Sequence, residues 1–369
     1  MSTQKRRAPA APEKPSRVIL DALPFDPSDA KLPRLQRLFG VQLDRARKAL
    51  LARPAVEAKG ADALRGHCLY KANLRTPLFM LEGLSRVMLG IGGDEEVFEE
   101  LLHDVKIIED VLGEVDFWWV VLEKGTAWEL PAEFLAYARD HHQVACGRLM
   151  GWLEARAWVD HRYLPEEGDV KLRVHRMGRT LADVSWPSPR KERKLVAEFL
   201  HEKVRATEKI AHELDLSDVE HGLHELRRRL RWLSIYAAAL DGAVQLDHAA
   251  KPPRNWNRYL TPAVVNNPFN DLPKGDGSIK PVLLPAPLFY ALSWTIAELG
   301  ALKDRAQWTE TVTHGLEAVG VAGVKPKKWL GDLTLEAREA GKQAAAIAEK
   351  TLFEDKLLQR LGEALEAQG

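Results

Sequence analysis

Apolar residues recur every three to four positions along most of this chain, and this spacing constrains the fold more than any other feature. Alternating runs of Val, Ile and Thr between turn residues, which are typical of strands, do not recur. The pattern therefore predicts an all-α protein. We expect helices over 32–53, 60–90, 95–112, 114–124, 131–158, 168–183, 189–213, 217–246, 287–302, 304–319 and 333–366.

A chain of 369 residues is longer than one small core requires, so we expect two domains or one unit built twice. We place the first helical half over 31–184 and the second over 185–369. Residues 1–30 are basic and rich in Pro and Ala, and we interpret them as a disordered tail. The second half contains a segment dense in Pro, Asn and Gly, over 251–281, which predicts a long ordered loop.

The two halves share landmarks in the same order: a phenylalanine followed by long charged residues, a basic helix, and a Leu-Gly pair. These landmarks are Phe39 and Phe199, then Cys68-Lys71-Arg75 and His224-Arg227-Arg231, then Leu112-Gly113 and Leu299-Gly300. The basic helices are offset by 156 residues, and the Leu-Gly pairs by 187 because the loop lies between them. The order predicts an internal repeat.

The basic helix of the second half gathers its cations on one face. At 100° per residue, an arc of about 100° contains four side chains, while leucines occupy the opposite side. The four are His224, Arg227, Arg228 and Arg231. The same geometry places Lys71, Arg75 and Arg86 on one face of the expected first-half helix.

Like charges one turn apart repel each other, so such a face needs a counter-charge. The whole chain has no net charge, with 53 Lys and Arg against 53 Asp and Glu, so a polyanion site requires local segregation of cations. A chain of phosphates supplies the counter-charge well, because the planar guanidinium fork matches phosphate oxygens. A solvated face that neighbouring carboxylates neutralise remains the alternative.

The segment His224-x-x-Arg227-x-x-x-Arg231, within LHELRRRLRWL and after FLHEKVRATEKIAHEL, resembles the CHAD domain, the conserved-histidine α-helical domain. Leu299-Gly300-x-x-Lys303-Asp304 is similar to the Leu-Gly-x-x-Arg-Asp motif of that family. The resemblance extends over residues 32–366, which is nearly the whole chain.

This resemblance implies a duplicated helical bundle, with two four-helix-bundle-like halves related by a pseudo-twofold axis. It also implies a basic channel that binds inorganic polyphosphate or a similar polyanion without catalysis. Asp304 would orient Lys303 or cap its helix, and His224 would gain charge below about pH 6.5. The residues expected to bind the polyanion are Lys71, Arg75, His224, Arg227, Arg228, Arg231 and Lys303.

The first half departs from the family pattern. Cys68 stands where the motif has histidine, Lys71 replaces arginine, and Asp116 lies where a basic residue is expected. These changes remove positive charge from one side of the expected channel. We therefore expect weakened or altered binding there.

Two other classes of function stay open. His103-Asp104 suggests a metal-dependent phosphohydrolase of the HD type, although both residues are flanked by charged positions and indicate a solvated face. The basic face could instead dock an acidic protein. The DHH string at 140–142 lies in an expected helix, whereas the phosphoesterases with that string have strand-rich folds. We expect no catalytic residues, bound metal or cofactor.

Composition favours a cytoplasmic protein, with association with polyphosphate granules as a further expectation. Only two cysteines occur, which indicates a reducing compartment without a disulfide framework. The basic N-terminal segment lacks the apolar core of a signal peptide, and Pro285 and Pro287 interrupt the longest apolar run. We therefore expect no membrane partner. Nucleic acid is also not expected, because the tryptophans lie mostly at core positions of helices.

Overall fold

The computed structural model describes residues 23–52, 61–159, 172–216, 218–321, 323 and 325–368. Within these ranges the chain is mainly helical, which agrees with the predicted all-α class. The first group of helices is α1 (Arg34–Leu50), α2 (Ala61–Lys71), α3 (Arg75–Gly90), α4 (Glu95–Ala127), α5 (Ala132–Ala155) and α6 (Arg173–Asp183).

The second group begins with α7 (Pro189–Ala211), a π-helical turn (Val219–His224), α8 (Glu225–Ala239) and β1 (Val244–Asp247). It continues with α9 (Pro262–Val265), β2 (Val282–Pro285), α10 (Ala286–Ala318), α11 (Lys327–Leu330), α12 (Ala337–Ala348), a second π-helical turn (Glu349–Glu354) and α13 (Leu357–Glu366). Short 3₁₀ turns occupy Asn257–Tyr259, Pro268–Asn270 and Gly331–Leu333.

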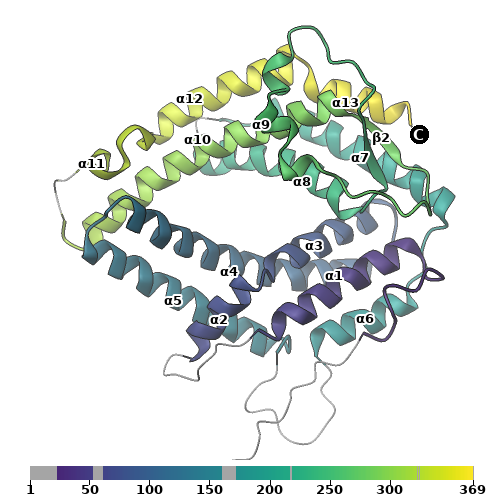
Figure 1. Ribbon diagram of the computed structural model, residues 1–369, viewed down its shortest axis with the longest axis horizontal. Helices are drawn as coiled ribbons and strands as arrows, with labels where there is room; N and C mark the ends of the chain where they lie inside the picture. Colours follow the sequence, from purple (N-terminus) through teal and green to yellow (C-terminus); the bar gives the residue numbers. More distant parts are fainter. Residues whose placement is uncertain are drawn as a thin grey trace, which may run out of the picture.

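The two groups of helices form two layers, and the chain passes from one to the other between α6 and α7 (Figure 1). They meet where α3 packs against α8, and again where α5 contacts α10. One hydrophobic core extends through both layers, from Leu35 to Leu365. A smaller cluster that includes Phe134 and Leu316 joins α5 to α10. The pseudo-twofold relation between the halves remains a prediction.

The long helices α4 and α10 differ from the expectation. Each is one continuous helix of 33 residues, about 50 Å long, where we expected breaks after Leu112 and Leu302. A mid-helix glycine such as Gly113 costs only about 1 kcal/mol relative to alanine. Packing on neighbouring helices offsets that cost, so the predicted breaks were wrong.

Elsewhere the expected helices were too long. The range 60–90 divides because Asn73 takes the left-handed conformation (φ 60°) and Pro77 lies in the first turn of α3. Asp241 and Gly242 also have positive φ and end α8. The range 333–366 is interrupted at Lys356, which has φ 56°.

Two short strands were not predicted. β1 lies at the end of the helix expected over 217–246, and β2 directly follows the expected loop. β1 pairs with β2 in parallel, with Val244 opposite Val282. The pair brackets the predicted loop, which is ordered and buries Trp256 and Tyr259. The predicted tail lies outside the described residues up to position 22. Residues 23–27 contact the helices instead: Phe25 and Pro27 lie against Gly40 of α1, and Leu23 and Pro24 lie against Gly178 of α6.

A buried ion pair joins the two layers. The Nε atom of Arg34 donates to Oε1 of Glu192 at 2.8 Å, and the two side chains are only 4% and 1% exposed. Arg34 also donates to the carbonyl oxygens of Leu240 (2.6 Å) and Asp241 (3.3 Å). Burial raises the pKa of Glu192, and Arg34 opposes this change. The pair therefore fixes the start of α1 against α7 and the end of α8.

Candidate polyanion site

A cavity of about 260 Å³ lies where α3, α4 and α8 meet, and we call it the arginine cleft. Five of the seven residues that the sequence assigned to a polyanion line it. They are Arg75, His224, Arg227, Arg228 and Arg231. At Gly83, α3 lies against α8, and a Cβ atom there would be in ordinary van der Waals contact with Ile235 and Ala239, at 3.4 Å. The predicted face of α8 and the start of α3 therefore open into one shared cavity.

Arg227 and Arg231 differ from the other arginines of the cleft because they contact no carboxylate within the described part of the chain. The Nε atom of Arg227 is buried and has no hydrogen-bond acceptor among the described residues. The guanidinium of Arg231 lies 5.0 Å from the centre of the Phe79 ring. Desolvation lowers the pKa of Arg231, the positive charges of Arg227 and Arg75 lower it further, and the carboxylates of Glu109 and Asp116 raise it. Among the described residues, Arg231 therefore has only the more distant charges of Glu109 and Asp116 to balance it, and Arg227 has no ion-pair partner.

Arg75 is already neutralised. It contacts Glu109 at 3.1 Å and Asp116 at 2.6 Å, and its guanidinium lies 5.2 Å from the centre of the Phe79 ring. Asp116, which the sequence marked as a loss of positive charge, is therefore an ion-pair partner of Arg75. Arg228 is likewise paired, with Glu225 at 2.6 Å.

Each Leu-Gly pair provides room for an arginine side chain. A Cβ atom on Gly113 would lie 3.1 Å from Arg75, and one on Gly300 would lie 2.8 Å from Nε of Arg227. Arg75 and Arg227 thus occupy corresponding positions, each against the glycine of a Leu-Gly pair, and they are 152 residues apart in the sequence. The sequence alignment at 156 had instead paired Arg75 with Arg231.

His224 is half-buried beside the arginines. Its Nδ1 atom is buried and has no hydrogen-bond partner among the described residues. Desolvation lowers its pKa; Glu220 raises it, and Lys303 and the neighbouring arginines lower it further. His224 is therefore neutral at pH 7, and it gains charge only at a lower pH than the predicted value of about 6.5.

Two predicted residues lie outside the cleft. Lys71 ends α2, where its Nζ atom is 4.2 Å from the centre of the Trp119 ring and 3.9 Å from Glu123. The break between α2 and α3 removes it from the face that carries Arg75. Lys303 binds Gln307 at 2.6 Å and Asp304 at 3.3 Å. It lies near enough to His224 to influence its pKa, but it does not line the cavity.

The opposite wall of the cleft is partly acidic. Glu82, Glu109 and Asp110 line it together with five Lys or Arg side chains, so the lining carries a net charge of +2. Glu109 and Asp110 also hold Lys106, which contacts Glu109 at 3.1 Å. Sequence reasoning missed Lys106 and these carboxylates, because it could not show which face of α4 turns towards α8.

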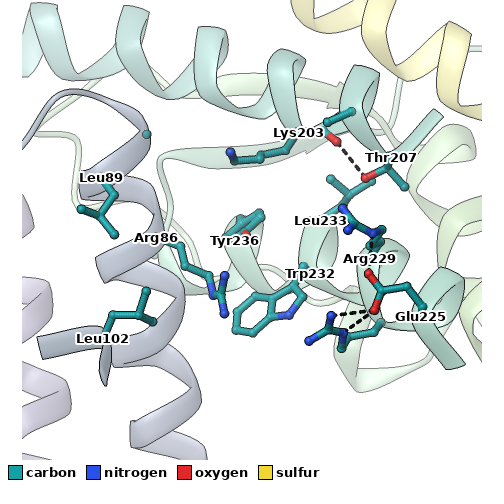
Figure 2. A pocket seen from close by; sticks show the side chains of 13 residues that line it. Arg86, Leu89, Leu102, Lys203, Thr207, Glu225, Arg229, Trp232, Leu233 and Tyr236 are labelled. Carbon is teal, nitrogen blue, oxygen red and sulfur yellow. Dashed lines mark hydrogen bonds and ion pairs between the residues drawn. The ribbon is translucent and has the colours of Figure 1, made fainter. Parts of the chain in front are cut away.

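A second cavity, of about 440 Å³, lies beside Trp232, and we call it the Trp232 cavity (Figure 2). Residues of α3, α4, α7 and α8 line it. Its cations are Arg86, Lys203, Arg228 and Arg229, with Glu225 as the one carboxylate among its lining residues. Arg228 and Trp232 line both cavities. Sequence reasoning missed Lys203 and placed Arg229 outside the cluster.

The His103-Asp104 pair does not form a metal site in the described part of the chain, where no group of three or more His, Cys, Asp or Glu residues converges. His103 is exposed, whereas Asp104 is buried, contrary to the predicted solvated face. Arg156 contacts one oxygen of Asp104 at 3.2 Å, and Arg173 contacts the other. Asp104 thus has a role in joining α4, α5 and α6.

Comparison with known proteins gives no match to any family model, curated protein or solved structure. Among the described helices, none combines the length and apolar character needed to cross a bilayer. The resemblance to the CHAD domain remains a prediction, and the functional assignment depends on the cleft itself.

Proposed function

We propose that this protein binds inorganic polyphosphate or a similar polyanion in the arginine cleft, without turning it over. The supporting observation is the pair Arg227 and Arg231, which share the cleft without a carboxylate partner among the described residues. Guanidinium groups bind phosphate oxygens through paired donors, and they lose water more readily than ammonium groups. A phosphate chain would supply the missing counter-charge and accept a hydrogen bond from Arg227.

The charges of the cleft limit how much of a polyanion it engages. Arg75 and Arg228 are already paired with carboxylates, and the net charge of the lining is +2. We therefore expect a short stretch of phosphates to contact Arg227 and Arg231, while the rest of the chain continues into solvent. We also propose a cytoplasmic location, where the protein would associate with polyphosphate granules.

Calorimetric titration with long-chain polyphosphate, tripolyphosphate and single-stranded DNA tests this function. Long-chain polyphosphate should bind, and its affinity should fall steeply with salt because binding releases counterions. DNA should bind more weakly, because its phosphates are more widely spaced than those of polyphosphate. Equal affinity for DNA, or no binding of polyphosphate at low salt, would contradict the proposal.

The same samples test for turnover. Protein incubated with Mg²⁺ or Mn²⁺ and polyphosphate should release no free phosphate. Release that the His103→Ala variant abolishes would favour the metal-dependent phosphohydrolase instead, because His103 is exposed whereas Asp104 is buried in ion pairs. Binding of an acidic protein segment in place of polyphosphate would favour the docking alternative.

Gly300→Ala should weaken polyphosphate binding without destabilising the fold. The new methyl group would lie 2.8 Å from Nε of Arg227, so the arginine must move away from its place in the cleft. Alanine gains about 1 kcal/mol over glycine in a helix, which offsets the local crowding. Binding is measured by calorimetry and stability by thermal melting.

Gly147→Ala is the matched control. Gly147 lies in α5, and a Cβ atom there meets no other atom within 4 Å. This variant should be more stable than the parent, by roughly 0.5–1 kcal/mol, with unchanged polyphosphate affinity. A Gly300→Ala protein with full affinity would show that the position of Arg227 does not matter for binding.

A further inference from the structure

The Trp232 cavity has both an apolar wall and cations. Leucines line this cavity, whereas none of the described leucines lines the arginine cleft. Leu89, Leu102 and Leu233 line it together with the rings of Trp232 and Tyr236. The two rings stack with their centres 5.4 Å apart and an angle of 29° between their planes. An inorganic phosphate chain has nothing to bury against such a wall. The wall therefore favours a ligand with an apolar, flat part.

Four cations border the same cavity, and they are only partly neutralised. Arg228 and Arg229 share the single carboxylate of Glu225, each at 2.6 Å. Arg86 lies 4.9 Å from the centre of the Trp232 ring and binds Glu82 at 2.8 Å. The lining itself has four cations and one carboxylate, and with Glu82 and Glu202 counted as the partners of Arg86 and Lys203, one positive charge is left unbalanced. An anionic group on the ligand would balance this charge.

Lys203 and Tyr236 supply further contacts for an anion. Figure 2 shows the Lys203 side chain extending from α7 on the side of the cavity opposite Glu225. Its Nζ atom is 3.5 Å from Glu202 and 5.2 Å from the centre of the Phe199 ring. The hydroxyl of Tyr236 has no hydrogen-bond partner among the described residues, and burial raises its pKa to about 12. It therefore remains a neutral hydrogen-bond donor at physiological pH.

We propose that the Trp232 cavity binds a small organic phosphate with a flat ring, of the nucleoside phosphate class. The ring would pack on the wall formed by Trp232 and the leucines, and the phosphates would contact Lys203, Arg228 and Arg229. A volume of about 440 Å³ is within the range of small-molecule sites. The cavity shares Arg228 and Trp232 with the arginine cleft but is otherwise lined by different residues, and its occupancy does not require polyphosphate binding.

The two sites differ in residues that can be changed independently. Lys203 lines only the Trp232 cavity, whereas Arg231 lines only the arginine cleft. Arg86 is a poor choice for mutation, because it is the ion-pair partner of Glu82, whose side chain is fully buried. Lys194, on the same helix as Lys203, lines neither cavity and pairs with Glu198 at 3.6 Å, so it serves as the control.

The experiment is calorimetric titration of the full chain with ATP, tripolyphosphate and adenosine. ATP should bind roughly tenfold or more tightly than tripolyphosphate, because the base adds stacking on the aromatic wall. Adenosine alone should bind more weakly than ATP. Lys203→Ala should weaken ATP binding roughly tenfold or more, and Lys194→Ala should leave it unchanged. Leu102→Ser should reduce the preference for ATP over tripolyphosphate.

Long-chain polyphosphate separates this proposal from the previous one. Lys203→Ala should keep its polyphosphate affinity, and Arg231→Ala should keep its ATP affinity. Equal binding of ATP and tripolyphosphate would overturn the organic phosphate site, as would full ATP affinity in Lys203→Ala. ATP binding in a protein that fails to bind polyphosphate would reject the function of the arginine cleft alone.

Discussion

Arg34→Ala should destabilise the protein by about 3–5 kcal/mol at pH 7, because it leaves a buried carboxylate without its partner. Glu192 is 1% exposed, and the Arg34 guanidinium is its ion-pair partner in the structure. The variant also removes the hydrogen bonds to the carbonyl groups of Leu240 and Asp241. Urea denaturation followed by circular dichroism measures the free energy of unfolding.

The loss should depend on pH in a defined direction. Burial already holds the pKa of Glu192 above its ordinary value of 4.5, and removal of Arg34 raises it further. When the pKa of a carboxyl is higher in the folded state than in the unfolded state, the free energy of unfolding decreases as the pH rises towards the folded-state pKa. The destabilisation caused by Arg34→Ala should therefore be larger at high pH and shrink as the pH falls, because Glu192 in the folded variant takes up a proton at a pH above its ordinary pKa of 4.5.

Two further variants make this result specific. Arg34→Met combined with Glu192→Leu should recover most of the stability, because no buried charge remains. Arg148→Ala breaks an exposed pair with Glu114, whose side chains are 49% and 32% exposed, and should cost at most about 1 kcal/mol. If Arg34→Ala behaved like Arg148→Ala, the pair would not join the two layers in solution.

Local sequence signals predicted much of the helical framework. Asp94, which precedes an acidic first turn, caps α4 by accepting a hydrogen bond from the backbone of Val97 at 3.2 Å. Pro189 lies in the first turn of α7. The breaks at Asn73 and at Asp241-Gly242 also have local signals, which the apolar periodicity concealed. Gly113, by contrast, could not be recognised as a mid-helix residue, because its place depends on an arginine from another helix.

The sequence could predict the part of the site that lies on a single helix, α8. The spacing from Arg227 to Arg231 places these side chains together on α8 whatever the rest of the fold, and His224 ends the π-helical turn just before that helix. The carboxylates of α4 and the ammonium group of Lys203 reach the same region through packing between helices. Nothing in the spacing along the chain shows that packing. Lys71 was misplaced for the related reason that α2 and α3 are separate helices.

The second large effect is on binding. Replacing Arg227 and Arg231 together with alanine should remove most of the polyphosphate affinity. Each hydrogen bond to a charged group contributes about 1.5–3 kcal/mol, and the salt dependence should become weaker because fewer phosphates are neutralised. Lys71→Ala should have a much smaller effect, because Lys71 lies outside the cleft. Without ligand, the double variant should be as stable as the parent protein or slightly more stable, because repulsion between the two arginines is removed.

Arg227 and Arg231 are proposed to bind an external anion and not to stabilise the fold. Paired measurements on the double variant test this claim most directly: calorimetry with long-chain polyphosphate at two salt concentrations, and thermal melting without ligand. We predict a large loss of affinity, a weaker salt dependence and an unchanged or slightly higher melting temperature. A much lower melting temperature with unchanged polyphosphate binding would show that the two arginines stabilise the fold, and it would contradict the claim.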